Sequence, residues 1–432
     1  MDALHGKWRR RDVLSFIEEY AGISRAEIYQ TELDKMNDTP AESYCKAELE
    51  TIEALGAVLL ETAAEIVEKD RAGRLEDLLE LIDPVQISKR PDGMTGKVRD
   101  IANLCIMHHL IGHLAILIME PFLHARIMPT QHASIPGRGQ TRLKDQVQKF
   151  VHSTGLGIRR ARKIDGHRAY ASIHYSDVIK IVETELPSAT ELRAILRFLA
   201  MLAPGGVLII GGYPDAWFFN LIMSYCLRHA MKQHSTRRGK KIPYIIRADA
   251  YMDDVCFMTT TRKGMERGIK AFRDYAAKEY GLEIRFTTGE IELLSIDEEK
   301  RRRAETRPGR RGCPGIDLAG FEIYRTHIRI RPRVYRRARR QFLRAAAEVK
   351  ATGTMRIQRA QRLISYYGYF KQTDAIKARR ALDADRLLKI AKKIVGHFSR
   401  VEIKKKKEEI YHAFCRSMRK RYAAARLFGG TA

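Results

Sequence analysis

Two kinds of apolar pattern follow each other along this chain. Over residues 54–67 and 75–82, apolar residues recur at spacings of three and four among acidic ones, which predicts amphipathic helices. After turn-forming residues at 88–96, the pattern favours a strand at 97–104 and a long apolar helix over 105–128. Strand-like and helix-like segments then alternate to about residue 330, and the remainder is helical and basic. We therefore expect an α+β core between helical ends.

Two adjacent carboxylates interrupt the most strand-like of these segments. Asp253 and Asp254 lie in the run RADAYMDDVCFM, where apolar residues flank them on both sides. Neighbouring like charges repel, and a hard divalent cation with oxygen ligands is the usual way to relieve them. A hairpin turn would present both side chains at one edge of a sheet, where two metal ions can serve a phosphoryl transfer. A solvated acidic turn is the plain alternative.

A two-metal site needs a third carboxylate from a neighbouring strand. Asp165, in the run RRARKIDGHRAYASI, is the candidate.

Charge is spread unevenly over the 432 residues. The net charge is +27, with −8 on residues 1–90 and +35 on the rest. A body this basic is typical of a protein that binds a polyanion, most simply nucleic acid. A membrane surface is the rival, but no run reaches the roughly 18 uncharged apolar residues of a spanning helix, and the N-terminus lacks the apolar core of a signal peptide. We expect no membrane partner.

Three further features are less specific. The six cysteines are scattered without CxxC spacing, which fits a reducing cytoplasm and argues against a structural zinc site. His109 and His113 have the i, i+4 spacing of a metal pair, although an ordinary helix face explains them better. The basic segment 298–312 is expected to be a loop, either a solvated charge run or a contact for backbone phosphates.

The run Lys163-Ile164-Asp165, followed in register by Tyr170-Ala171-Ser172-Ile173, resembles the first palm strand of reverse transcriptases. Together with YMDD it resembles the bacterial group that includes retron, group II intron and diversity-generating enzymes. The resemblance covers residues 90–380, with six blocks in the correct order. It implies a right-hand polymerase fold: an acidic helical region at 1–88, fingers at 89–160, a palm at 161–330 and a basic helical thumb at 331–432.

The resemblance also implies roles for individual residues. Asp165, Asp253 and Asp254 would bind two Mg²⁺ ions, with Mn²⁺ as a substitute, and Tyr170 would be the steric gate against a 2′-hydroxyl. The remaining blocks are GKVR at 96–99, SIPGRG at 134–139, DLAGF at 317–321 as a primer grip, and LISYYGY at 363–369 as a thumb helix. They imply nucleotide contacts from Lys97, Arg99, Tyr170, Ile210 and Gly211, and nucleic-acid contacts from Arg138, Asp317, Gly320 and Phe321.

Two departures from the family pattern stand out. The run from Ile210 to Ala216, IGGYPDA, has no Gln before its first glycine, so reduced base discrimination is a hypothesis, and Asp215 is expected to add negative charge beside the template. After the YMDD turn, GLEIRFTTG lacks the lysine that would protonate pyrophosphate. Arg285 is near that position, but its high pKa makes it a poor acid, so the role stays unassigned.

The sequence thus predicts an RNA-directed DNA polymerase that makes cDNA from an RNA template and deoxynucleotides in the cytoplasm. A catalytically idle nucleic-acid-binding scaffold is the alternative, and an RNA-directed RNA polymerase is a third reading that Tyr170 disfavours. A bacterial retroelement or anti-phage defence system, with a dedicated noncoding RNA, is the expected setting. The N-terminal helices are expected to bind a protein partner or a second copy. The sequence identifies neither template, primer nor oligomeric state.

Overall fold

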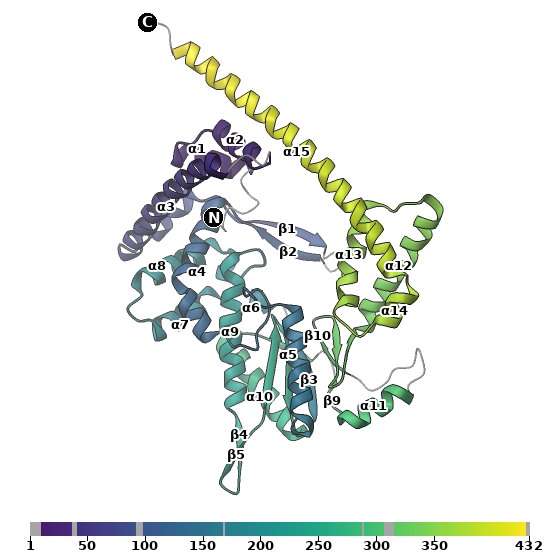
Figure 1. The fold of residues 1–432 in the computed structure, drawn as a ribbon. Helices are drawn as coiled ribbons and strands as arrows, with labels where there is room; N and C mark the ends of the chain where they lie inside the picture. Colours follow the sequence, from purple (N-terminus) through teal and green to yellow (C-terminus); the bar gives the residue numbers. More distant parts are fainter. Residues whose placement is uncertain are drawn as a thin grey trace. The chain divides into compact units, whose positions relative to one another are not determined.

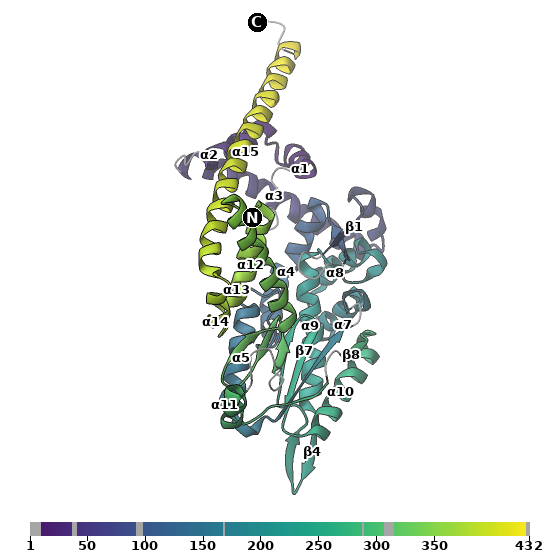
Figure 2. The ribbon, with the colours of Figure 1, turned by 90° about the vertical axis from the view of Figure 1, so that its right-hand side faces the viewer.

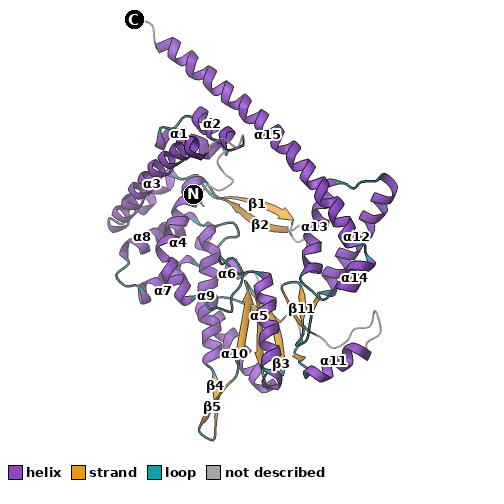
Figure 3. Ribbon diagram, viewed as in Figure 1, coloured by secondary structure: helices purple, strands orange, loops and turns teal. Residues whose placement is uncertain are grey.

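The computed structural model describes residues 10–36, 41–91, 98–166, 169–286, 289–305 and 315–428. The chain forms two compact units. The first comprises Met1–Ala115, Ser188–Leu202 and Gly396–Ala432, and the second comprises Ile116–Pro187 and Ala203–Val395. Helices predominate in the first unit, whereas the second combines helices with antiparallel sheets (Figure 3), which confirms the predicted α+β class.

The first unit is built around the predicted N-terminal helices. The segments predicted at 54–67 and 75–82 fall in α3 and in the 3-10 helix η2, respectively. A buried cluster that includes Val13, Ile17, Leu55 and Ile106 holds α1, α3 and the start of α4 together. The elements of this unit are α1 (Arg11–Ala21), α2 (Arg25–Met36), α3 (Ala41–Arg71), η2 (Leu75–Leu81), β1 (Gln86–Pro91), β2 (Val98–Asn103), the beginning of α4 (Ile106–Arg126), and α8 (Thr190–Leu202).

Strand β2 and helix α4 confirm the strand and long helix predicted for 97–128. Among the described residues, α4 alone is long and apolar enough to cross a membrane by length and composition, and half of its most apolar window is buried. A helix of a protein core meets the same criteria, so this finding does not identify a membrane segment.

The central sheet of the second unit has the strand order β6-β7-β3-β8, and β9 also pairs with β3. Figure 1 labels β3 and β9 of this sheet, and Figure 2 labels β7 and β8. Side chains alternate across it, as strand geometry requires. Phe257 packs edge-on against Phe272 of α10, whereas Cys256 and Met258 pack with Val147 of α5 on the other face. The strands are β3 (Arg160–Gly166), β6 (Arg247–Tyr251), β7 (Asp254–Thr259), β8 (Ile284–Phe286) and β9 (Ile291–Glu292), and the flanking helices named here are α5 (Gln140–Ser153) and α10 (Arg262–Tyr280).

Two smaller sheets complete the second unit. They are the three-stranded sheet β10 (Ile316–Leu318), β11 (Phe321–Ile323) and β12 (Ile328–Ile330), and the hairpin β4 (His234–Arg237) and β5 (Lys240–Pro243).

The predicted basic helical segment after residue 331 is confirmed. The remaining helices are η3 (Gly155–Gly157), α6 (Ala169–Ser172), α7 (Tyr175–Glu185), η4 (Pro204–Gly206), α9 (Tyr213–Lys232), α11 (Ile296–Glu305), α12 (Pro332–Thr352), α13 (Ile357–Lys371), α14 (Ile376–Ala381) and α15 (Ala384–Phe428), which extends into the first unit.

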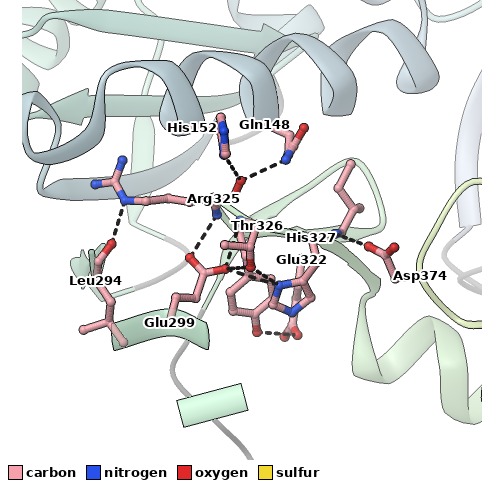
Figure 4. A network of polar contacts seen from close by, with 11 residues as sticks. Gln148, His152, Leu294, Glu299, Glu322, Arg325, Thr326, His327 and Asp374 are labelled. Atoms are coloured by element: carbon pink, nitrogen blue, oxygen red, sulfur yellow. Dashed lines mark hydrogen bonds and ion pairs between the residues drawn. The ribbon is translucent and has the colours of Figure 1, made fainter. Parts of the chain in front are cut away.

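A buried arginine ties the three-stranded sheet to α5 and to the central sheet (Figure 4). Arg325 is 1% exposed, and its guanidinium donates to the backbone carbonyls of Leu294 (2.6 Å), Val151 and Ile158. Because each carbonyl would otherwise be a buried acceptor without a partner, this one side chain satisfies three backbone groups from different segments.

Glu299 of α11 closes the same network (Figure 4). Its carboxylate accepts hydrogen bonds from the backbone N–H groups of Arg325 (3.0 Å) and Thr326 (3.1 Å), and it pairs with His327. Burial opposes its charge, but the hydrogen bonds hold the pKa of Glu299 below its ordinary value. The prediction of a loop at 298–312 was therefore wrong in its first part, because residues 298–305 belong to α11 and are anchored by this network. Residues 306–314 lie outside the described part of the chain.

Candidate active site

The adjacent carboxylates lie where the structure turns from β6 to β7. Tyr251 pairs with Asp254, so Met252 and Asp253 alone form the turn. Met252 has a φ of 54°, in the left-handed region that a side chain rarely adopts. Strained backbone of this kind is found at functional sites more often than elsewhere. The turn places Asp253 at its tip and Asp254 at the first position of β7.

Asp165 lies on the strand next to this turn. Strand β3 pairs with β7 through Ile164 and Val255, so Asp165 is the following residue toward the turn. Gly166 then lets the turn approach closely, because a Cβ atom there would lie 3.2 Å from the Cβ of Asp253 and 2.9 Å from that of Ala169. Sequence reasoning did not single out Gly166, although the glycine directly after the strand aspartate was the available signal.

Electrostatics make these three carboxylates, which we call the carboxylate cluster, costly in the metal-free protein. Burial, and then the Asp165 charge, raise the pKa of Asp253 well above its ordinary value. Burial also raises the pKa of Asp254, against the opposing effect of Lys163, whose Nζ lies 2.8 Å from Asp254 Oδ2.

The donor set suits a hard divalent cation. Mg²⁺ takes oxygen ligands, and carboxylates from two adjacent strands supply them. A dication between Asp165 and Asp253 would offset the burial and like charge that raise the pKa of Asp253. In the arrangement seen here, no group of three His, Cys, Asp or Glu side chains within the described ranges is gathered to hold a metal ion, and Asp254 is paired with Lys163 instead.

Tyr170 lies beside the turn, on the short helix α6. Its ring stacks in parallel on Phe219 of α9, with centroids 4.9 Å apart, and its hydroxyl lies 3.7 Å from the sulfur of Met252. Burial, and then the charges of Asp215 and Asp253, raise the pKa of Tyr170, so the phenol stays neutral. Phe219, which fixes the ring, was missed because nothing in the sequence pairs it with Tyr170.

Ile210 and Gly211 form the turn before α9, where Ile210 is 37% exposed and Gly211 has a φ of 126°. Asp215 was expected to face the template, and this was wrong, because its side chain is 1% exposed. Its carboxylate accepts the Ile209 N–H at 2.8 Å, and burial raises its pKa to about 7. Asp215 also lies against Gly212, where a Cβ would be 1.8 Å from its Oδ2. It therefore holds the turn in place.

The predicted primer-grip segment is the hairpin β10–β11. Ala319 and Gly320 form its turn with φ values of 48° and 91°, the pattern of a type I′ connection. Phe321 was expected to contact nucleic acid; its side chain is 1% exposed and packs in the core, and the nucleic-acid contact stays a prediction. Asp317 is ion-paired with Arg331, whose charge also lowers the pKa of Asp254.

Four other residues were singled out from the sequence, namely Arg138, Arg99, Lys97 and Arg285. Arg138 donates through Nη1 to the backbone carbonyls of Met128 (2.7 Å) and Gln131 (2.9 Å), so it braces its own loop, and its RNA contact stays a prediction. Arg99 is exposed on β2 in the first unit, and Lys97 lies outside the described residues. The backbone of Arg285 pairs with Asp165, but its side chain is outside the described part of the structure.

Comparisons with known proteins give only distant structural similarity. No protein-family model matches the chain, and no curated protein sequence matches it. The solved structure of apo telomerase from Candida Tropicalis has 10% identity and a TM-score of 0.42, covering 79% of this chain and 62% of that one. The same telomerase truncated from its C-terminal domain has 9% identity and a TM-score of 0.41, covering 58% and 55%. A Sicinivirus 3Dpol RNA dependent RNA polymerase has 14% identity and a TM-score of 0.32, covering 56% and 51%.

The chain thus spans between about half and three fifths of the length of these structures. At these identities and TM-scores the similarity assigns neither a family nor a function to the chain.

Proposed function

We propose that this protein is an RNA-directed DNA polymerase of the right-hand type. One observation carries the proposal: Asp165 on β3 and the Asp253-Asp254 turn of β6–β7 meet at one edge of an antiparallel sheet. Such a cluster of acids is costly without cations and is the donor set that two-metal nucleotidyl transfer requires. Under this proposal the fingers are residues 89–160, the palm 161–330 and the thumb 331–432, preceded by an acidic helical region at 1–88.

The carboxylate cluster would hold two Mg²⁺ ions, for which Mn²⁺ could substitute. Bound ions would act as Lewis acids toward the oxygens of the reacting phosphate. Asp165 and Asp253 would serve as ionised ligands, and the cations would offset the burial and like charge that raise the pKa of Asp253. Lys163 would orient Asp254 and balance part of its charge.

In the reaction, the primer 3′-hydroxyl loses its proton to water and its oxygen forms a bond to the α-phosphorus of a deoxynucleotide. The bond from that phosphorus to the pyrophosphate oxygen breaks, and pyrophosphate leaves. No described side chain is assigned as the acid that protonates pyrophosphate. Arg99, together with Lys97, is proposed to contact the incoming triphosphate, since guanidinium and ammonium groups suit phosphate oxygens.

Tyr170 is proposed to select deoxynucleotides. Its ring cannot swing toward α9 because Phe219 already stacks on that face, so the phenol stays beside Met252 and Asp253. A 2′-hydroxyl arriving at this position would clash with the ring. Tyr170→Ala should therefore raise ribonucleotide incorporation relative to deoxynucleotide incorporation, measured by extension with each nucleotide set. An unchanged ratio would remove the gate role.

The test of the polymerase proposal is primer extension on an RNA template with Mg²⁺ and all four deoxynucleotides. The native chain is compared with Asp253→Asn/Asp254→Asn, and with Asp274→Asn, which removes a carboxylate on the exposed face of α10. Extension by the native and Asp274 proteins, and none by the double variant, supports a polymerase. RNA binding without extension in all three would favour the idle scaffold instead, and extension with ribonucleotides alone would favour an RNA polymerase.

The proposal also covers the biological setting of the protein. A bacterial retroelement or an anti-phage defence system, with a dedicated noncoding RNA as template, fits the basic body and the acidic N-terminal helices, which are proposed to bind a protein partner or a second copy. Sequencing the nucleic acid that copurifies tests this directly. One recurrent structured RNA together with its cDNA is the expected result, whereas random cellular RNA would contradict it.

Reduced fidelity is proposed from Ile210, which occupies the position of a hydrogen-bonding Gln. Ile210→Gln should lower the misincorporation frequency in sequenced extension products. Equal frequencies in the two proteins would remove this hypothesis.

A further inference from the structure

The hairpin β4–β5 is an exposed, strongly basic element of the second unit, and the proposed polymerase chemistry assigns it no role. Its residues from His234 to Pro243 read HSTRRGKKIP and include four Lys or Arg and no acid. Nearly every side chain along both strands is exposed. Figures 1 and 2 both show this hairpin, which we call the basic hairpin, projecting from the body of the second unit beyond α10.

The arrangement of positive charges lowers the stability of the basic hairpin. Arg237 pairs directly with Lys240 across the two strands, and like charges in that position are destabilising. Arg238 and Gly239 form the turn with φ values of 49° and 75°, so a third cation stands at the tip. None of the four cations has an ion-pair partner within the described ranges of the chain. A bound polyanion would turn this repulsion into attraction.

The base of the basic hairpin is firmly attached. The Tyr244 N–H donates to the Gln233 carbonyl at 2.9 Å, and Thr259 Oγ1 donates to the Tyr244 carbonyl at 2.6 Å. Arg267 of α10 lies over the Tyr244 ring and donates to its hydroxyl at 3.1 Å. Because an isolated two-stranded hairpin is only marginally stable, these contacts are what hold the cations in a fixed place.

The basic hairpin lies at the opposite end of β6 from the carboxylate cluster. The chain leaves β5 at Pro243, enters β6 at Arg247 and reaches the turn only after Tyr251. Strand rise alone separates the two ends of β6 by roughly 13 Å, and the basic hairpin extends further away. Nucleic acid held there would therefore be a segment that is not reacting.

We infer that the basic hairpin binds the phosphate backbone of double-helical RNA outside the active site. This rests on the proposed function, which supplies RNA as the nucleic acid. Cations occur on both faces, since Arg237 and Lys240 share one face and Lys241 lies on the other. The wide minor groove of an RNA helix offers phosphate rows on two sides of an inserted element, and recognition there is by shape and backbone. A flat lipid surface would meet only one face of the hairpin.

The test uses the full-length protein and a short blunt RNA duplex, without Mg²⁺ or nucleotides, so that binding is measured apart from catalysis. The variant Arg237→Gln/Lys240→Gln/Lys241→Gln is compared with the control Lys180→Gln/Lys270→Gln/Lys278→Gln, which removes the same charge from exposed sites on α7 and α10. Anisotropy titrations at several salt concentrations should give the hairpin variant a salt slope smaller by about 2 to 3, and roughly tenfold weaker binding or more, while the control behaves like the native protein.

Equal salt slopes for the hairpin variant and the control would overturn the inference. The inference would also be overturned if a DNA duplex competed for the protein as well as an RNA duplex does. The same holds if the native protein and the control bound phosphatidylserine vesicles and the hairpin variant did not. The hairpin variant should extend a short primer on a short RNA template as fast as the native chain. RNA-duplex binding is thus measured whether or not the chain polymerises. The inference about the basic hairpin and the proposed polymerase function can therefore fail separately.

Discussion

Two hairpin turns in the second unit begin with the same backbone conformation but have different roles. The turn between β6 and β7 and the turn between β10 and β11 each contain two residues, and each begins with a non-glycine residue at positive φ, Met252 at 54° and Ala319 at 48°. The first turn gathers carboxylates beside Asp165, whereas the second is followed by the fully buried Phe321 and covered by Tyr369. What packs against a turn, and not its backbone, decides whether it contributes chemistry or stability.

The two turns should therefore respond oppositely to substitution. At the first turn, burial and like charge oppose folding in the metal-free protein, so removing a charge should harm activity and spare the fold. At the second turn, contacts favour folding, so a substitution should harm the fold and spare the chemistry of the molecules that remain folded.

The largest effect is expected at the first turn. Asp253→Asn keeps the size of the side chain but removes a ligand charge, so extension should fall by roughly a thousandfold or more. The melting temperature without Mg²⁺ should stay equal or rise, because the buried repulsion with Asp165 is gone. Extension rates and thermal melts on the same preparation check both. A strongly destabilised but active variant would reverse our account of this turn.

The next effect concerns how closely the turn approaches β3. Gly166→Ala would place a Cβ 2.9 Å from the Cβ of Ala169 and 3.2 Å from that of Asp253, so α6, the turn or both must shift. We expect extension to fall by roughly ten- to a hundredfold, since small misplacements of reacting groups are costly. Gly157→Ala is the matched control, because a Cβ there meets nothing within 4 Å. Equal rates in both variants would show that the approach at Gly166 is not needed.

The second turn should lose stability instead. Gly320→Ala combines a φ of 91° with a Cβ 2.8 Å from Tyr369, and we expect a loss of about 2–3 kcal/mol. Gly353→Ala, at a φ of 71° with open space around it, should lose only about 1 kcal/mol. Urea unfolding of the two variants separates the clash from the backbone strain. Equal losses would mean that Tyr369 moves aside freely.

The smallest effect is a dependence of stability on pH. The pKa of Asp215 is about 7 in the folded chain, against about 4 when unfolded, so the folded state binds more protons in between. Stability should therefore fall as the pH rises from about 4 to about 7. Burial lowers the pKa of His108 to about 4. The unfolded chain therefore binds more protons there, and this contribution makes stability rise with pH between about 4 and about 6.5.

Comparing Asp215→Asn with the native chain isolates the Asp215 contribution, because His108 is common to both. Melting temperatures across this pH range should fall less steeply in the variant. Mg²⁺ should leave the difference unchanged, because Asp215 is not one of the proposed ligands and its carboxylate is held by Ile209 and Tyr175. Identical pH profiles would contradict the raised pKa of Asp215.

The sequence predicted well what depends on local pattern. The strand-like apolar runs on both sides of Asp253 and Asp254 predicted the hairpin, and the search for a third acid led to Asp165, which the structure places on the adjacent strand. The helices before residue 85 and after 331 followed from spacing and composition.

Features that depend on contacts between distant segments could not be predicted. Asp215 is polar and follows a turn, which favours exposure, yet it is buried against Tyr175 from α7. Phe321 was assigned to nucleic acid from its motif, but the core formed by α5 and the two sheets encloses it. The helix at 296–305 depends on Glu299, whose partners at 325–327 lie far along the chain. Each case needs tertiary burial, which periodicity does not encode.

The central claim is that Asp165, Asp253 and Asp254 form a two-metal site. The most direct measurement is a Mn²⁺ titration followed by electron paramagnetic resonance, on native protein and on Asp253→Asn, with primer, RNA template and an unreactive deoxynucleotide analogue present. We predict two tightly bound ions in the native complex and at most one in the variant. Equal occupancy in both proteins, or no tight binding in either, would contradict the account.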